Sequence, residues 1–217
     1  MKRVFPVLPV ISRTQLGVID GQTIPEAAII DTIPTHLLAA IYAISLPFAH
    51  EDDYLCLLTA YEQPSAARIW KISYMLIIDA IHTPKLSVIQ AGVLYLHKNI
   101  NDATVDTAFT WSFMGTVVGL THSLGLNLQC SLFGLPAQEK RLRRRLWWAV
   151  YVEDKWISML FGRPPYIRST EWDVVELGSD DFAVGSRLRA PFGNHVRLPF
   201  EDLASLSVIC ESVQEDL

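Results

Sequence analysis

Cysteine is scarce in this sequence, with three residues among 217: Cys56, Cys130 and Cys210. No two of them are close enough to form the C-x-x-C pairs that a zinc site needs. The histidines share no metal-ligand spacing either. The sequence therefore predicts no metal or other cofactor in this chain, and the wide spacing of its cysteines favours a reducing compartment.

Charged residues are also few, at 19%, and the 18 lysines and arginines are outnumbered by 23 aspartates and glutamates. The resulting net charge of −5 argues against direct binding of a nucleic-acid backbone, because such domains are normally basic. Half of the residues are hydrophobic, which argues against disorder. The composition therefore predicts one compact domain that does not itself contact DNA.

Long apolar runs and common catalytic motifs are missing as well. The uninterrupted apolar stretches, such as 37–44 and 146–152, are shorter than the ~20 residues that cross a bilayer. No G-x-S-x-G, P-loop or G-x-G-x-x-G motif is found. A helical terpenoid synthase is the enzyme alternative, but Asp52 and Asp53 lack the third carboxylate of its Mg²⁺ motif. We expect neither a membrane span nor an enzyme.

What the sequence does contain is helical periodicity with almost no strand signal. Helices are expected at 32–46, 51–62, 65–82, 86–99, 105–124, 140–161 and 200–217. Thr32 is the expected N-cap of the first, Ser65 or Pro64 begins the third, and Gly125 ends the fifth. Short connections between helices favour antiparallel neighbours, so the predicted fold class is all-α, a helical-hairpin array.

Apolar positions mark two of these helices with particular clarity. In the third they are Ile69, Ile72, Met75, Leu76 and Ile78. In the last, one face carries Leu203, Leu206, Ile209 and Val213. Gly115 and Gly119 form a G-x-x-x-G within the fifth, which predicts close packing of another element against that helix.

The segment 140–165 is the most distinctive part of the chain. A basic run, Lys140 to Arg145, opens a helix in which apolar residues recur every three or four positions and tryptophans occupy the other rows. A helix that is apolar on several faces is predicted to lie at the centre of its domain. Gly162 is expected to end it in a left-handed conformation, and Pro164 keeps it from resuming.

The run R-R-R-L-W-W…D-x-W…G-R-P in this segment resembles the signature of a known family. That family is the regulatory middle homology region, or fungal-specific regulatory domain, of fungal zinc binuclear cluster transcription factors. Upstream, His82-x-Pro84 and Leu124-Gly125-Leu126 are similar to other family segments, as is Trp172-Asp173-Val174 downstream. The signature residues are Arg143, Arg144, Arg145, Trp147, Trp148, Asp154, Gly162, Arg163 and Pro164.

This resemblance implies a domain organisation. It implies an N-terminal segment at 1–24, through which the chain enters the domain, and a helical regulatory core at 25–168. Glycines, Pro191 and polar residues predict a surface loop at 169–198, and apolar periodicity predicts a C-terminal helix at 199–217. In the family more helices usually follow, so the last helix is not expected to complete the domain. The zinc-cluster module that the family carries upstream is absent from these residues, because the cysteine pairs are missing.

The resemblance also implies a function: a regulatory domain that modulates transcription driven by an attached zinc-cluster DNA-binding module. It implies a nuclear protein, with DNA and zinc bound only through that module. A co-regulator or a small-molecule inducer would be the partner, and homodimer formation stays open. The alternatives are a helical protein-interaction scaffold or a co-regulator deficient in DNA binding, since helical periodicity fits both.

For the signature residues, a structural role is expected over a direct contact. The basic run is interpreted as a solvated or salt-bridged face rather than a localisation signal, and the tryptophans as core rather than a stacking platform. Asp154 lies on the same stripe as Val150 and Ile157, where an unpaired carboxylate would be costly. We therefore predict a buried ion pair between Asp154 and Arg163 that fixes the turn after the helix.

Overall fold

The computed structural model describes residues 8–12, 14–17, 27–51, 55, 65–98, 107–182 and 199–215. Within these residues all regular structure is helical, which confirms the all-α prediction. The elements are η1 (Thr14–Leu16), α1 (Ala27–Ile30), α2 (Thr35–Ser45), η2 (Leu46–Glu51), α4 (Ala66–Ala80), α5 (Leu86–Leu96), α6 (Thr107–Ser123), α7 (Ala137–Phe161), η3 (Ser169–Glu171), α8 (Ser179–Phe182) and α9 (Pro199–Glu215). The helix expected at 51–62 lies almost wholly outside the described residues.

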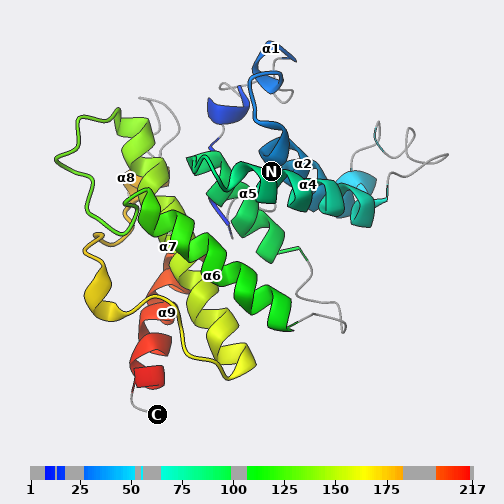
Figure 1. Ribbon diagram of the computed structural model, residues 1–217. Helices are drawn as coiled ribbons and strands as arrows, with labels where there is room; N and C mark the ends of the chain where they lie inside the picture. Colours follow the sequence, from blue (N-terminus) through cyan, green and yellow to red (C-terminus); the bar gives the residue numbers. More distant parts are fainter. Residues whose placement is uncertain are drawn as a thin grey trace.

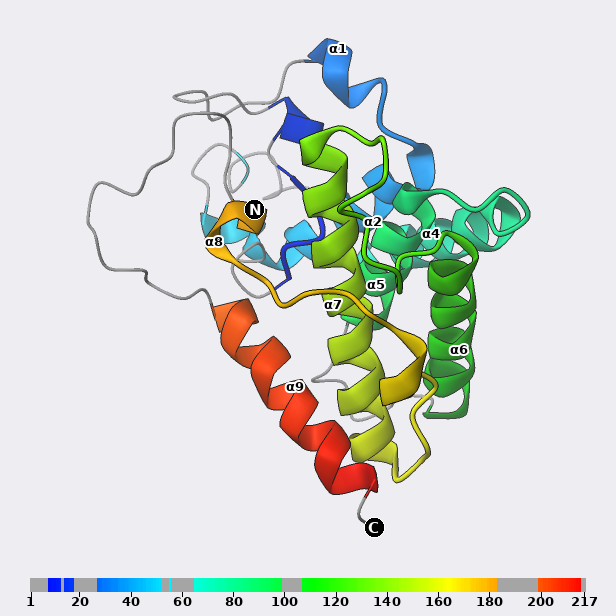
Figure 2. The ribbon, with the colours of Figure 1, turned by 90° about the vertical axis from the view of Figure 1, so that its left-hand side faces the viewer.

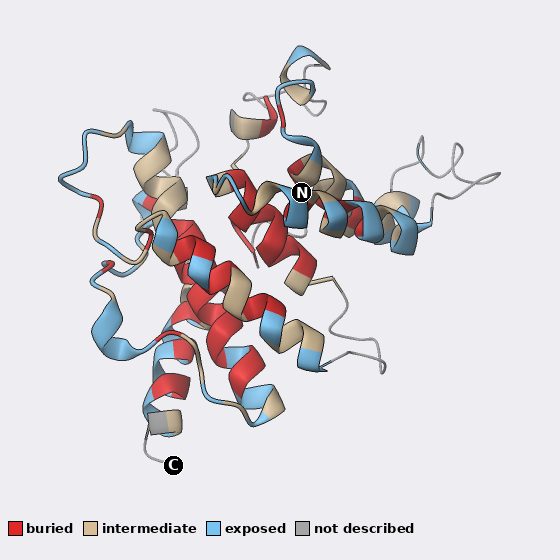
Figure 3. Cartoon of the chain, in the orientation of Figure 1, coloured by how far each residue is buried: buried red, intermediate tan, exposed pale blue. Residues whose placement is uncertain are grey.

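The helices are arranged around α7, the longest of those described. Helices α2, α4 and α5 pack on one another, α5 and α6 pack on α7, and α8 and α9 pack on another side of α7 (Figures 1 and 2). Buried residues are concentrated on α5 and along the middle of α7, as Figure 3 shows. The prediction that the Trp-rich helix is central to its domain is therefore confirmed.

The ends of the helices follow from local sequence in most cases. Gly162 ends α7 in the left-handed region with φ 60°, and Gly125 follows α6 with φ 63°, as glycine permits without a Cβ clash. Ser65 caps α4 and accepts from the backbone N–H of Arg68. The expected cap at Thr32 is wrong: α2 begins after Pro34, and the Thr32 hydroxyl donates instead to the carbonyl of Ile29.

After α7 the chain turns at Gly162 and runs back along that helix (Figure 2). Ile167 lies beside Asp154, and the carbonyl of Val175 accepts a hydrogen bond from the Trp148 indole N–H at 3.0 Å. This return segment, residues 163–178, contains η3 and leads into α8. The predicted surface loop at 169–198 therefore carries two short helices in its described part, residues 169–182.

Two apolar faces that the sequence marks are buried only in part: Ile69 of α4 and Leu203 of α9 pack against the core, but most of the other marked residues do not. On α4 the buried residues are Trp70, Ser73 and Ile77, while Ile72, Met75 and Ile78 are exposed. On α9 the apolar residues Leu206, Ile209 and Val213 are exposed, whereas the small and polar residues Ser207, Cys210 and Glu211 are buried against α7. In both cases tertiary contacts, and not apolar periodicity, determine which face is covered.

Replacement of glycine by alanine is expected to have opposite effects on stability at two positions on adjacent helices. A Cβ on Gly92 of α5 would lie 2.9 Å from Cγ2 of Val117 on α6, whereas a Cβ on Gly119 would meet nothing within 4 Å. Gly92→Ala is expected to lower the free energy of unfolding by about 1–2 kcal/mol, because overpacking outweighs the gain in helix propensity. Gly119→Ala is expected to raise it by about 0.5–1 kcal/mol. Urea unfolding measures both, and changes of the same sign would contradict the packing argument.

Candidate functional site

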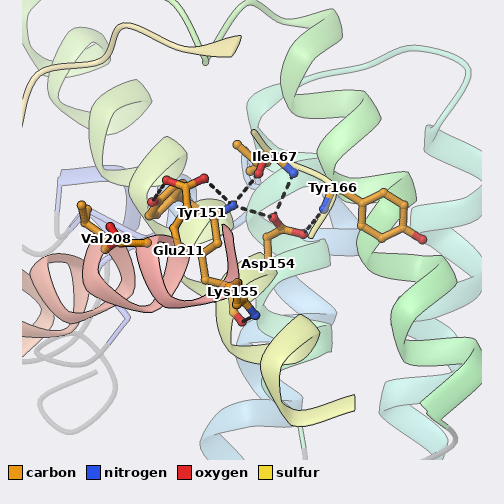
Figure 4. A network of polar contacts seen from close by, with 9 residues as sticks. Tyr151, Asp154, Lys155, Tyr166, Ile167, Val208 and Glu211 are labelled. Carbon is orange, nitrogen blue, oxygen red and sulfur yellow. Dashed lines mark hydrogen bonds and ion pairs between the residues drawn. The ribbon is translucent and has the colours of Figure 1, made fainter. Parts of the chain in front are cut away.

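The most distinctive cluster of side chains in the described structure is a buried polar network on α7 (Figure 4). Helix α7 contributes Tyr151, Asp154 and Lys155, and α9 contributes Glu211. Asp154 and Lys155 are fully buried, and Glu211 is 5% exposed. The backbone of the return segment completes the network at Tyr166 and Ile167. These residues join α7, the return segment that follows it directly, and the more distant α9, which begins at Pro199.

Lys155 is the centre of this network. Its ammonium lies 2.8 Å from Oε1 of Glu211 and 3.7 Å from Oδ2 of Asp154, and it donates to the carbonyl of Ile167. The Tyr151 hydroxyl donates to Oε2 of Glu211 at 2.7 Å. Burial, followed by this hydrogen bond, raises the pKa of the Tyr151 phenol well above its usual range. The tyrosine therefore stays a neutral donor at any physiological pH.

Asp154 is satisfied by the backbone and not by the predicted arginine. Its two oxygens accept from the N–H groups of Tyr166 at 2.9 Å and Ile167 at 3.0 Å. Burial raises the pKa of this carboxyl, while the two N–H groups and Lys155 act in the opposite direction. The predicted ion pair between Asp154 and Arg163 is wrong, because the adjacent residue on the helix, Lys155, reaches the carboxylate instead. Asp154 holds the chain after α7 at Tyr166 and Ile167, beyond the Gly162-Arg163-Pro164 turn that the prediction named.

Arg163 faces α6 instead. Its guanidinium lies 5.2 Å from the ring centroid of Trp111 and donates to the carbonyl of Thr107 at 3.4 Å. The Trp111 ring is tilted against Tyr166, with 4.6 Å between ring centroids. Gly115 allows this approach, because a Cβ there would lie 2.7 Å from the Tyr166 ring, whereas Gly119 has no such neighbour. The close packing predicted from the glycine pair therefore rests on Gly115 alone. Pro164 is exposed.

The three signature arginines are tied into the fold. Arg143 pairs with Glu139 at 3.1 Å and donates to the carbonyl of Leu124. Arg144 pairs with the buried Asp181 at 2.7 Å, and Arg145 donates to the backbone carbonyl of the same residue at 2.8 Å. Burial lowers the pKa of Arg145 to about 10, so it remains charged at neutral pH. These residues form a salt-bridged face, as the interpretation of the basic run expected.

Asp181 is the acceptor on which this arginine face depends, and it gives a testable prediction. Its carboxylate also accepts from the N–H of Gly178 at 3.0 Å. Asp181→Asn is expected to lower the free energy of unfolding by about 1–3 kcal/mol, since a buried charge-assisted bond is lost. The adjacent Asp180 is exposed, so Asp180→Asn serves as the control, with a change within about 0.5 kcal/mol. Similar losses in both variants, measured by urea unfolding, would exclude the proposed role of Asp181.

The signature tryptophans lie in an aromatic cluster in the interior. Trp147 is fully buried and Trp148 is 3% exposed, and both contact Trp172, with ring centroids 5.9 and 5.5 Å apart. Trp156 differs, because it is 37% exposed and its indole N–H donates to the hydroxyl of Ser207 on α9. Two of the three tryptophans expected in the core are thus buried, and the third lies at its edge.

The pair formed by His97, which follows α5, and Glu153 of α7 is expected to make the stability pH-dependent. Nδ1 of His97 lies 2.9 Å from Oε1 of the buried Glu153, and this hydrogen bond raises the pKa of His97. A raised pKa in the folded state contributes stability below the unfolded value and loses it as pH rises through the folded value. We expect the free energy of unfolding to fall as pH rises from the usual histidine pKa upward through the raised value of the folded state. Glu153→Gln should flatten this dependence; equal slopes in urea unfolding would refute the assignment.

Several chemistries find no support in the described residues. They contain no group of three or more His, Cys, Asp or Glu placed to hold a metal ion. None of the described helices is both long and apolar enough to cross a bilayer. The charged groups of the network are instead engaged with one another and with backbone groups. Such an arrangement can hold α7, α9 and the return segment in one geometry.

Sequence reasoning missed three residues of the buried network, Tyr151, Lys155 and Glu211, and it missed Asp181 of the arginine face. The only signal available was that Tyr151 and Lys155 lie in a helix that is otherwise apolar at these positions. A buried lysine there requires an anionic partner. Which carboxylate supplies it depends on the position of α9, and α9 is separated from α7 by a long stretch of chain.

Comparison with known proteins gives a consistent result. The family model described as the fungal specific transcription factor domain matches residues 12–183. The chain is 29% identical over 185 residues to an uncharacterized transcriptional regulatory protein of Schizosaccharomyces pombe, covering 85% of this chain and 27% of that protein. It is 34% identical over 152 residues to the transcriptional activator protein DAL81 of Saccharomyces cerevisiae, covering 69% and 15%.

A third relative is the cutinase transcription factor 1 alpha of Fusarium vanettenii, which is 25% identical over 183 residues, covering 82% of this chain and 19% of that protein. The chain thus spans between 15% and 27% of the length of these three relatives. No solved structure matches the chain.

Proposed function

We propose that this chain is the regulatory domain of a longer transcription factor. The premise is that the chain belongs to the family of the fungal specific transcription factor domain. The observation that carries the proposal is the family match over residues 12–183, which includes the whole of α7. The relatives are named as transcriptional regulators, an activator and a transcription factor, and not as enzymes. The expected site of action is the nucleus.

In this proposal, contact with DNA comes from an attached zinc-cluster module and not from the domain itself. The net charge of −5 supports this division, because a direct phosphate-backbone binder is normally basic. The basic side chains that open α7 are engaged in part with Glu139 and Asp181. They are therefore poorly placed to present a free cationic face to a phosphate backbone.

The signature residues are proposed to act as scaffold for the regulatory domain. Arg144 and Arg145 hold α8, Trp148 holds the return segment through Val175, and Asp154 holds the same segment through Ile167. Each contact fixes an element against α7 and leaves little of the side chain for a ligand. Regulation would then depend on surfaces that this scaffold positions.

A reporter assay tests the proposal. The chain is placed between a heterologous DNA-binding module and an activation segment in a fungal cell, and reporter transcription is compared with that of a fusion containing an inert helical spacer. We expect the chain to change transcription, and we expect Lys155→Met, which removes the cation at the centre of the network, to abolish the change. Lys71→Met is the control, because Lys71 is exposed on α4. Transcription equal to the spacer fusion, at equal protein level and nuclear location, would favour the interaction-scaffold alternative.

A further inference from the structure

Helix α4 presents an apolar stripe on the outside of the molecule. Ile72, Met75 and Ile78 are 44%, 61% and 40% exposed, and they lie opposite Trp70 and Ile77, which face the core. Figures 1 and 3 show α4 at the edge of the helical array, with exposed residues along its outer side. A stripe of several large apolar side chains, unlike a single exposed one, marks a surface for association with another protein.

A row of residues with opposite charges at its two ends runs through this stripe. Lys71, Met75 and Asp79 follow one another at intervals of four positions, so they form one row along the helix surface. Ile72 and Ile78 lie on either side of it, each three positions from Met75. Lys71 and Asp79 are both exposed. These five residues, the outer face of α4, place a cation at one end, an anion at the other and apolar side chains between them.

The outer face of α4 is complementary to itself when one copy is reversed. In two antiparallel copies related by a two-fold axis at Met75, residues equally far from Met75 in opposite directions lie at the same level. Lys71 of each copy then lies level with Asp79 of the other copy, and Ile72 lies level with Ile78. The commonest class of helix packing aligns rows of residues that are four positions apart, which brings the oppositely charged ends of the two rows together. One surface thus supplies two ion pairs and an apolar centre.

Helix α4 is already ordered before such pairing. Its start is capped by Ser65, whose side chain accepts from the N–H of Arg68, and its inner side packs against α2 and α5. Trp70 contacts Tyr95 of α5 edge-to-face, with 5.7 Å between ring centroids. Association therefore orders only the side chains of the outer face, which keeps its entropic cost low. Met75 suits the central position, because an unbranched side chain adapts to a second methionine.

We propose that the outer face of α4 is a homodimer interface, at which two copies of the chain pair antiparallel about Met75. The Lys71–Asp79 pairs set the orientation, and the apolar side chains between them supply most of the affinity. Arg68, which is exposed about one turn from Lys71, adds a second cation to the same end. A single helix face buries less than the about 800 Å² per partner of a standard interface, so a weak dimer with a Kd in the micromolar range is expected. This proposal concerns assembly of the chain and does not depend on its role in transcription.

Sedimentation velocity of the whole chain measures this assembly. The sedimentation coefficient is expected to rise with concentration through the micromolar range, from the monomer value to the dimer value. Lys71→Asp and Asp79→Lys each turn both ion pairs into like-charge contacts, and each is expected to raise Kd about tenfold or more. Lys71→Met removes the attraction without adding a repulsion, so it should raise Kd at most about fivefold.

Combining the two charge reversals distinguishes a paired contact from a general effect of charge. The double variant Lys71→Asp, Asp79→Lys re-forms both ion pairs in reverse and should dimerise like the wild type. An equimolar mixture of the two single variants should also dimerise, because the aspartate introduced at position 71 of one copy then faces the lysine introduced at position 79 of the other. Sedimentation of the mixture should give a lower Kd than either variant alone gives.

Met75→Glu and Ile209→Glu are a matched pair, because both side chains are 61% exposed. Met75→Glu brings two carboxylates together at the centre of the interface and should abolish the dimer, whereas Ile209→Glu, on α9, should leave Kd unchanged. Circular dichroism verifies that each variant is folded. A wild type that stays monomeric at the highest attainable concentration, a dimer that survives Met75→Glu, or a mixture no tighter than its two components would each overturn the proposal.

Discussion

Replacement of Lys155 by methionine is expected to lower the free energy of unfolding by about 3–5 kcal/mol, because the buried carboxylates of Glu211 and Asp154 then lack their cation. Methionine has a similar length, so little volume is lost. What is removed is the ammonium group beside Glu211 and Asp154 and its bond to the carbonyl of Ile167. The measurement is urea unfolding at neutral pH followed by far-ultraviolet circular dichroism.

The matched control is Lys71→Met, the same substitution at an exposed position of α4, with an expected change within about 0.5 kcal/mol. A second comparison separates charge from packing. If the unpaired carboxylate of Glu211 causes the loss, the double variant Lys155→Met, Glu211→Met should be more stable than Lys155→Met alone. A double variant that is less stable than the single one would show that the loss comes from packing.

The pH dependence of the Lys155→Met variant follows from the same argument. Burial raises the pKa of Asp154 in the wild type, and Lys155 is one of the groups that oppose this rise. Without the lysine, the folded state should take up a proton more readily. A carboxyl with a higher pKa in the folded state gains stability as pH falls. The difference between wild type and variant should therefore shrink in mildly acidic solution.

The sequence predicts the elements of this fold better than it predicts their contacts. The extent of α7, its central position and its end at Gly162 follow from residues close to one another in the chain. The same is true of the start of α4 at Ser65 and the end of α6 near Gly125. Local stereochemistry is sufficient in these places, since a glycine with positive φ or a serine cap acts within one turn.

The partners of buried charges could not be predicted in the same way. Asp154 was expected to pair with Arg163, which follows closely in the sequence, but two backbone N–H groups of the return segment and the adjacent Lys155 satisfy it. Backbone groups carry no sequence signature, so nothing in the residue pattern indicates which of them will approach a carboxylate. The position of Glu211 depends likewise on how α9 packs.

The buried face of α9 could not be predicted from its sequence either. Its apolar residues Leu206, Ile209 and Val213 predict a buried face by periodicity, yet all three are more than half exposed. The face toward α7 instead carries Ser207 and Glu211, because these side chains accept hydrogen bonds from Trp156 and Tyr151. Hydrogen-bond donors on α7 thus contribute to the rotation of α9, and the apolar periodicity of α9 contains no information about them.

Trp147→Ala is expected to cost about 3–5 kcal/mol, the range for truncation of a fully buried tryptophan. Its side chain has no exposed surface and lies between His122 and Trp172, at 6.0 and 5.9 Å between ring centroids. Within the described part of the chain its indole N–H has no acceptor, so the loss is one of packing and not of hydrogen bonding. Urea unfolding with circular dichroism again measures it.

The matched control lies on the same helix. Trp156→Ala removes an indole that is 37% exposed and donates to Ser207, and it should cost about 1–2 kcal/mol, since less apolar surface is lost from the interior. Equal losses in the two variants would contradict the assignment of Trp147 to the core.

The same two variants also test the proposed scaffold role. If the signature tryptophans act as scaffold, the effect of Trp147→Ala on reporter transcription should follow the loss of folded protein. A transcriptional defect in Trp147→Ala at a temperature where the variant is fully folded would instead indicate that this tryptophan takes part in a contact.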